Sequence, residues 1–110
     1  MAQLVFTNKF KKDIELLQKR GYHMELIKEA ILMLEETGFL PSDYSPYKLS
    51  GNYSGYLEAH IKPDWLIIWK LKIDENEIWL TRTGTHSDLF KRLFKFYFLI
   101  LLSISFIIAN

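Results

Sequence analysis

The chain has 110 residues, 49% apolar and 15% aromatic, which is enough for one packed domain and excludes wholesale disorder. It contains no cysteine, which excludes disulfides, thiolate metal sites and thiol nucleophiles and fits a reducing cytoplasm. The formal charge of +1 excludes nucleic-acid binding by overall positive charge, so an RNA partner would have to meet a local basic patch. The N-terminus carries no secretion signal, and we expect a cytoplasmic protein.

The first half of the chain is predicted to form a short strand and a helical hairpin. Residues 4–6 are strand-like, and Thr7 or Asn8 then supplies an N-cap. Two apolar stripes at helical spacing predict the helices: Phe10, Ile14 and Leu17, then Met24, Ile27, Ile31 and Leu34. Gly21 separates the helices, and Gly38 ends the second one because glycine tolerates a left-handed C-cap.

Basic side chains are concentrated on the first predicted helix. They are Lys9, Lys11, Lys12, Lys19 and Arg20. This cluster is the candidate patch for RNA, with Lys9 and Lys12 as candidate substrate-binding residues. The alternative for each of them is an ordinary solvated helix face.

The second half of the chain predicts three antiparallel strands. Residues 40–53 are rich in turn-forming residues and predict a loop, after which the hydrophobic period changes to two along residues 57–62. Residues 65–69 are apolar throughout and predict a central strand covered on both faces, and residues 77–83 predict the last strand. The fold class is therefore α+β, with the helices packed on one face of an antiparallel meander.

A hydrophobic tail follows this domain. Residues 96–109 contain only apolar residues and two serines, and basic residues precede them. Fourteen helical residues span about 21 Å, whereas a bilayer core needs about 30 Å. Three interpretations stay open: packing on the domain or a partner chain, membrane contact as a lesser alternative, or a dispensable extension.

Two histidines, an arginine and two carboxylates lie near the ends of the predicted strands. Cleavage of RNA by its own 2′-hydroxyl needs a base, an acid and a group that stabilises the phosphoryl oxygens. His60 and His86 suit the proton roles, and Arg82 suits the phosphate role. Asp64 completes the set, with Glu58 as a further carboxylate on the strand of His60. The alternatives are inert surface histidines, an Arg82 that only pairs with a carboxylate (Glu58 or Asp88), and an Asp64 that is a turn residue.

The position of Arg82 depends on the geometry of the last strand. Simple alternation places Arg82 on the same face as Ile78 and Leu80. If those apolar residues point at the helices, Arg82 reaches the other face only where the strand bends or bulges.

The sequence offers little support for a metal or cofactor. His60, Asp64 and His86 could bind a transition metal in principle, but their spacing matches no metalloprotease-like signature. We expect no cofactor. Aromatic side chains are mostly core candidates, although Phe90 could stack on a base.

Three segments of the second half carry a family resemblance. Residues 51–56, 58–65 and 82–90 resemble the signature segments of YafQ-type toxins, which belong to the RelE/ParE toxin–antitoxin superfamily. The resemblance covers about residues 1–91, so residues 1–91 are assigned as the toxin domain and residues 92–110 as a separate tail.

The resemblance implies a RelE-like fold and a metal-independent mRNA interferase that cleaves messages in the ribosomal A site. It also implies a cognate antitoxin as a partner, and contact with ribosomal RNA. Matched to the motifs, the implied catalytic residues are His60, Asp64, Arg82 and His86. The terminal aromatic is Phe90, and Trp65 stands where the family often has an aromatic or aliphatic residue beside the active site. The further substrate-binding candidates are Tyr47, Glu58, Trp65 and Phe90.

The chain departs from the family pattern in two places. Tyr47 stands where members often have a loop histidine, and a tyrosine is a poor base at neutral pH. The tail after Lys91 is the second departure. The alternative function is a non-catalytic or gyrase-directed ParE-like toxin that binds its antitoxin. The histidines and carboxylates argue against it, because ParE-like relatives lack them.

Overall fold

The computed structural model describes residues 1–89. The predictions made for Phe90 and for the tail at residues 92–110 lie outside the described residues. Within residues 1–89, no helix is both long enough and apolar enough to cross a membrane.

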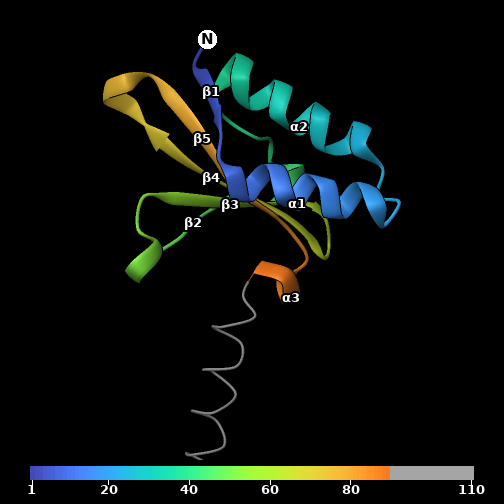
Figure 1. The fold of residues 1–110 in the computed structure, drawn as a ribbon. Helices are drawn as coiled ribbons and strands as arrows, with labels where there is room; N and C mark the ends of the chain where they lie inside the picture. The colour runs from blue at the N-terminus through green and yellow to red at the C-terminus, as the bar shows by residue number, and fades with distance from the viewer. Residues whose placement is uncertain (90–110) are drawn as a thin grey trace, which may run out of the picture.

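Two helices cover one face of a five-stranded mixed sheet, and a short third helix follows the last strand (Figure 1). The elements are β1 (Gln3–Phe6), α1 (Asn8–Lys19), α2 (Met24–Thr37), β2 (Tyr47–Lys48), β3 (Tyr56–Lys62), β4 (Trp65–Lys72), β5 (Glu77–Gly84) and α3 (His86–Leu89). The strand order is β1-β5-β4-β3-β2, in which β1 runs parallel to β5 and all other pairs are antiparallel. The α+β fold with a helical hairpin is therefore confirmed.

The helix boundaries follow from their end residues. The Thr7 hydroxyl accepts a hydrogen bond from the Phe10 amide at 3.1 Å and donates to the Thr81 carbonyl at 3.0 Å, so one side chain caps α1 and ties it to β5. Gly38 ends α2 at a φ of 77°, a left-handed conformation that glycine adopts without a Cβ penalty. Both ends agree with the sequence expectation.

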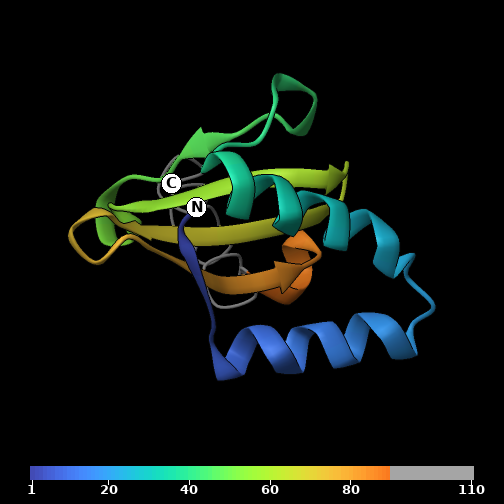
Figure 2. The same ribbon diagram turned by 90° about the horizontal axis from the view of Figure 1, so that it is seen from above.

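The two faces of the sheet have different surroundings. The helix face packs against α1 and α2; Figure 2 shows α2 lying across the sheet and α1 running antiparallel to α2 along the side of β5. Its strand residues are Leu57, Ala59, Ile61, Ile67, Trp69, Ile78 and Leu80. The opposite face, here called the site face, carries Tyr56, Glu58, His60, Ile68, Lys70 and Arg82. The first five residues of β4 are all buried, which confirms the prediction of a central strand covered on both sides.

A β-bulge on β5 decides the position of Arg82. Trp69 pairs with Leu80, whereas the preceding Ile68 pairs with Arg82, so Thr81 is an extra residue in β5. Leu80 therefore points at the helices while Arg82 lies on the site face beside Ile68. This bulge is the irregularity that Arg82 needs in order to reach the face opposite Ile78 and Leu80.

Candidate active site

Two imidazoles meet at one end of the site face. His60 is near the end of β3 and His86 begins α3, and their ring centroids are 5.8 Å apart with planes inclined by 42°. Both side chains are accessible, with exposed fractions of 32% for His60 and 53% for His86. The bulge and the turn after β5 therefore bring together histidines that are 26 positions apart in the sequence.

Asp64 holds His86 through two hydrogen bonds. Its Oδ1 accepts from the backbone amide of His86 at 3.0 Å and lies 2.6 Å from the ring Nδ1. These bonds lower the pKa of the Asp64 carboxyl below its usual range, the backbone bond being the larger cause. The carboxylate can accept a hydrogen bond from a protonated Nδ1, and its negative charge stabilises the positively charged ring. The other ring nitrogen, Nε2, is then left for chemistry.

His60 has a different set of partners. Its Nδ1 lies 3.3 Å from the carbonyl oxygen of Pro63, and a carbonyl can only accept a hydrogen bond. This contact favours the tautomer with the proton on Nδ1 and the lone pair on Nε2. The Glu58 carboxylate is 3.8 Å from that Nε2, close enough to interact with a proton acquired there.

The start of α3 is fixed by a second carboxylate. Asp88 accepts hydrogen bonds from the Thr85 amide at 3.1 Å and from Arg20 at 2.7 and 3.1 Å. The ion pair with Arg20 lowers the pKa of Asp88 to about 2. A Cβ on Gly84 would lie 3.1 Å from Asp88, so glycine permits this close approach. The segment that carries His86 is thus held at both of its ends.

Arg82 is held by a residue of α1. Its Nε donates to Asp13 Oδ2 at 2.7 Å, and its Nη2 donates to Asp13 Oδ1 at 3.2 Å. Asp13 Oδ2 also accepts from the Thr83 amide at 3.1 Å. The bond to Asp13 is the main cause that raises the pKa of Arg82. The fork of Arg82 is therefore fixed on one side, and neither Glu58 nor Asp88, the partners named from sequence, is the one it pairs with.

Sequence reasoning missed Asp13, although the sequence contains a signal for it. Asp13 lies three residues after Phe10 and four before Leu17, on the buried side of an amphipathic helix. A carboxylate in that position needs a partner, because an unpaired charge there would lose hydration. The partner could not be named before β5 was placed against α1.

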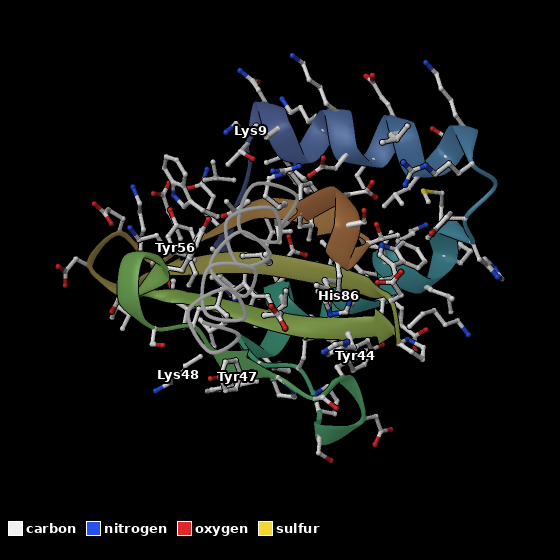
Figure 3. The ribbon with its side chains drawn as sticks, turned by 90° about the horizontal axis from the view of Figure 1, so that it is seen from below. Lys9, Tyr44, Tyr47, Lys48, Tyr56 and His86 are labelled. Atoms are coloured by element: carbon white, nitrogen blue, oxygen red, sulfur yellow. The ribbon has the colours of Figure 1, made fainter. Side chains whose placement is uncertain are left out.

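The remaining predicted residues divide into two groups. Tyr47 pairs with Glu58 across β2 and β3 and is exposed (Figure 3), and Lys9 lines a hollow that Arg82 also lines. Lys12 is exposed on α1. Trp65 is not brought to the site surface, because it is 2% exposed and donates to Thr83 Oγ1 at 3.0 Å within the core.

The basic cluster of α1 is smaller than the sequence predicted. Arg20 binds Asp88, and this ion pair raises the pKa of Arg20. Its charge is therefore compensated inside the protein. The lysines of α1 stay as the candidate basic patch for RNA.

The geometry offers no ready metal site in the part of the chain that the structure describes. Within residues 1–89, no three His, Asp or Glu side chains converge closely enough to hold an ion. A hollow of about 480 Å³ between α1 and α2 is lined mainly by apolar side chains, and it lies on the helix layer away from the histidines. The polar chemistry is therefore concentrated on the site face.

Comparisons with known proteins show the family to which the chain belongs. Residues 2–91 match the family described as bacterial toxin of type II toxin-antitoxin system, YafQ. The mRNA interferase toxin YafQ of Escherichia coli (strain K12) is 37% identical over 86 residues, covering 77% of this chain and 91% of that protein.

Solved structures share the fold as well. A crystal structure of the Escherichia coli DinJ-YafQ complex has a chain that matches with a TM-score of 0.74 and 35% identity, over 82% of this chain and 99% of that chain. A metal-bound toxin from Helicobacter pylori matches with a TM-score of 0.75 and 33% identity, over 82% and 100% of the two chains.

Proposed function

Because the chain belongs to the YafQ family of type II toxins, we propose that it is an mRNA interferase that cleaves messages in the ribosomal A site. The pair of accessible imidazoles 5.8 Å apart supports this activity most directly. A single phosphodiester group could lie between a base and an acid placed in this way.

The reaction we propose is attack by the RNA's own 2′-hydroxyl. The 2′-oxygen forms a bond to phosphorus, the bond from phosphorus to the 5′-oxygen breaks, and the products are a 2′,3′-cyclic phosphate and a 5′-hydroxyl. His60 is assigned as the base because its contact with the Pro63 carbonyl favours a lone pair on Nε2. His86 is assigned as the acid that protonates the 5′-oxygen, because Asp64 stabilises its charged form.

Arg82 is assigned to the phosphoryl oxygens. Its Nε and Nη2 are held by Asp13, which leaves Nη1 as a donor in a fixed direction. A guanidinium keeps its charge at every physiological pH and stabilises the charge that develops on phosphate. No metal is assigned a role in this scheme.

The partners we propose are a cognate antitoxin, messenger RNA and the ribosome. The antitoxin follows from family membership and from the DinJ-YafQ complex of the relative. The ribosome would supply contacts that a chain of net charge +1 lacks. Translated messages place the action in the cytoplasm.

Induced expression tests the proposal. The parent chain should arrest growth and translation, and 5′ ends of cellular mRNA should accumulate at in-frame positions within codons. His86→Gln should lower cleavage about 100-fold or more, the usual effect of losing a general acid. Equal toxicity of parent, His60→Gln and His86→Gln, or DNA damage with intact messages, would instead support the gyrase-directed alternative.

Purified components test the chemistry. Cleavage of a message on programmed ribosomes should persist in EDTA, and His86→Gln should lower the single-turnover cleavage rate about 100-fold because it removes the general acid. Loss of cleavage in EDTA with recovery on adding a divalent metal would contradict the metal-independent scheme.

A further inference from the structure

A second hollow lies on the site face beside Arg82. It has a volume of about 250 Å³, and it is lined by Lys9, Tyr53, Tyr56, Ile68, Thr81, Arg82 and Leu89. These residues come from six separate parts of the fold, so the hollow exists only in the folded chain. It is smaller than the roughly 300–1,000 Å³ of sites for drug-sized ligands, which fits one ring system with its attached group.

Two tyrosines form an aromatic corner of this hollow. The ring centroids of Tyr53 and Tyr56 are 6.4 Å apart and their planes are inclined by 74°, so one ring meets the other nearly edge-on. Tyr53 is 41% exposed although it is aromatic. A flat ring that stacks on one tyrosine would contact the edge of the other, which is a favourable aromatic geometry.

Positive charge surrounds the aromatic corner. The Lys70 ammonium lies 5.1 Å from the centroid of the Tyr56 ring, and Lys9 lines the hollow itself. Arg82 also lines the hollow, but its charge is paired with Asp13. The first turn of α1 contains Lys9 and no acidic residue, so basic charge adds to the positive end of the helix dipole. A lysine at the N-terminus is unfavourable for the stability of the helix, but the combined positive charge attracts an anion.

The hollow shares Arg82 with the proposed active site and lies on the same face of the sheet. Tyr56, Glu58 and His60 point to the same face of β3, and the register places Arg82, Ile68 and Glu58 in one row across three strands. Tyr56 and His60 are four residues apart, about 13 Å along a strand. Figure 3 shows Tyr56 and His86 over different parts of this face, with Lys9 on α1. A strand of RNA lying on it would pass both places.

We propose that this hollow, the tyrosine subsite, binds a nucleotide of the message adjacent to the cleaved bond. Its base stacks in the corner formed by Tyr53 and Tyr56, and its phosphate is contacted by Lys9. The inference rests on the proposed nuclease function, but it concerns Tyr53, Tyr56 and Lys9, to which the cleavage scheme assigns no role. An aromatic ring with a cation recognises any base through its π-face, so the subsite strengthens binding with little sequence preference.

Binding of a labelled single-stranded hexa-adenylate, measured by fluorescence anisotropy, tests this subsite. The full chain carries His86→Gln throughout so that the RNA stays intact. Tyr56→Leu should raise the Kd about tenfold, the order of one lost base–aromatic stack, and Tyr56→Phe should stay within about twofold. Lys9→Gln should reduce the slope of log K against log salt by about 0.7, and the control Lys28→Gln should leave the slope unchanged.

A second experiment changes the RNA instead of the protein, and it controls for variants that fold poorly. Each base of the hexanucleotide is replaced in turn by an abasic unit. One position should weaken binding about tenfold in the Tyr56 protein, and that penalty should be absent in Tyr56→Leu. An equal abasic penalty in both proteins, an unchanged Kd in Tyr56→Leu, or undetectable binding by the parent would overturn the subsite.

The two proposals fail in different ways. If His86 is required for cleavage but changes at Tyr56 and Lys9 alter neither binding nor cleavage, the subsite is wrong and the nuclease stands. If the hexanucleotide binds with the stacking and salt signatures while no message is cut, the nuclease is wrong and the hollow remains only as a nucleotide-binding site without cleavage.

Discussion

The helix face and the site face of the sheet use the same strands for opposite purposes. On β3, Leu57, Ala59 and Ile61 pack against the helices, while Glu58 and His60 between them lie on the site face. The packing of the helix face depends on the volume and burial of its side chains, and each of these side chains contacts several others. The site face depends on a few specific pairs, in which the identity of the charged group matters more than its size. A substitution should therefore affect stability on the first face and function on the second.

The largest effect is expected on the helix face. Leu80 is completely buried, and Leu80→Ala should lower the free energy of unfolding by about 2–5 kcal/mol because it removes packing and leaves a cavity. Ile73, which is 83% exposed, is the matched control, and Ile73→Ala should stay within about 0.5 kcal/mol. Urea denaturation measures both. Comparable losses in the two variants would mean that the assigned core is wrong.

The next effect concerns the ion pair between Asp13 on α1 and Arg82 on the site face. Asp13→Asn should lower cleavage about tenfold, since Arg82 loses the carboxylate that directs its fork, and should cost about 1 kcal/mol of stability. Glu15→Gln, on the exposed side of the same helix, should change neither quantity.

Separate measurements of the maximal cleavage rate and of apparent binding identify the role of Asp13. Single-turnover cleavage on programmed ribosomes should show a lower maximal rate with little change in apparent binding. A purely structural role would instead reduce the amount of folded protein without changing the rate per folded molecule, and that result would remove Asp13 from the mechanism.

The smallest effect is a pH dependence at the anchor of α3. The pKa of Asp88 falls from 3.8 to about 2 on folding, so its ion pair with Arg20 stabilises the folded state above about pH 4. This contribution should disappear as the pH falls from about 4 to about 2, where the carboxylate becomes protonated. The urea midpoints of the parent and Asp88→Asn should therefore differ at neutral pH and converge over that window. A difference that is constant with pH would show that the ion pair contributes nothing.

Much of the fold could be predicted because local patterns repeat along the chain. The apolar stripe from Phe10 to Leu17 and the alternation around Ala59 indicate element type without any knowledge of tertiary contacts. Thr7 and Gly38 mark helix ends for equally local reasons. The parallel pairing of β1 with β5 was not predicted, because it joins residues more than seventy positions apart.

The candidate site could be predicted only in its residue types. His60, Asp64 and His86 were named from sequence, and their mutual contacts agree with that choice, while their catalytic roles stay predictions. The burial of Trp65 was expected for a core aromatic and conflicts with direct contact to substrate. Tyr53 and Tyr56 gave no signal of a shared corner, since aromatic residues in strands usually belong to the core.

The sequence by itself determined the α+β class, the helical hairpin, the central apolar strand and the group of side chains able to move protons. These follow from hydrophobic period and from side-chain chemistry, which are properties of neighbouring residues. Only the tertiary structure decided which face Arg82 occupies and that Asp13 holds it. One extra residue at Thr81 reverses the alternation of β5, and an ion pair between distant segments exists only after the chain has brought α1 and β5 together.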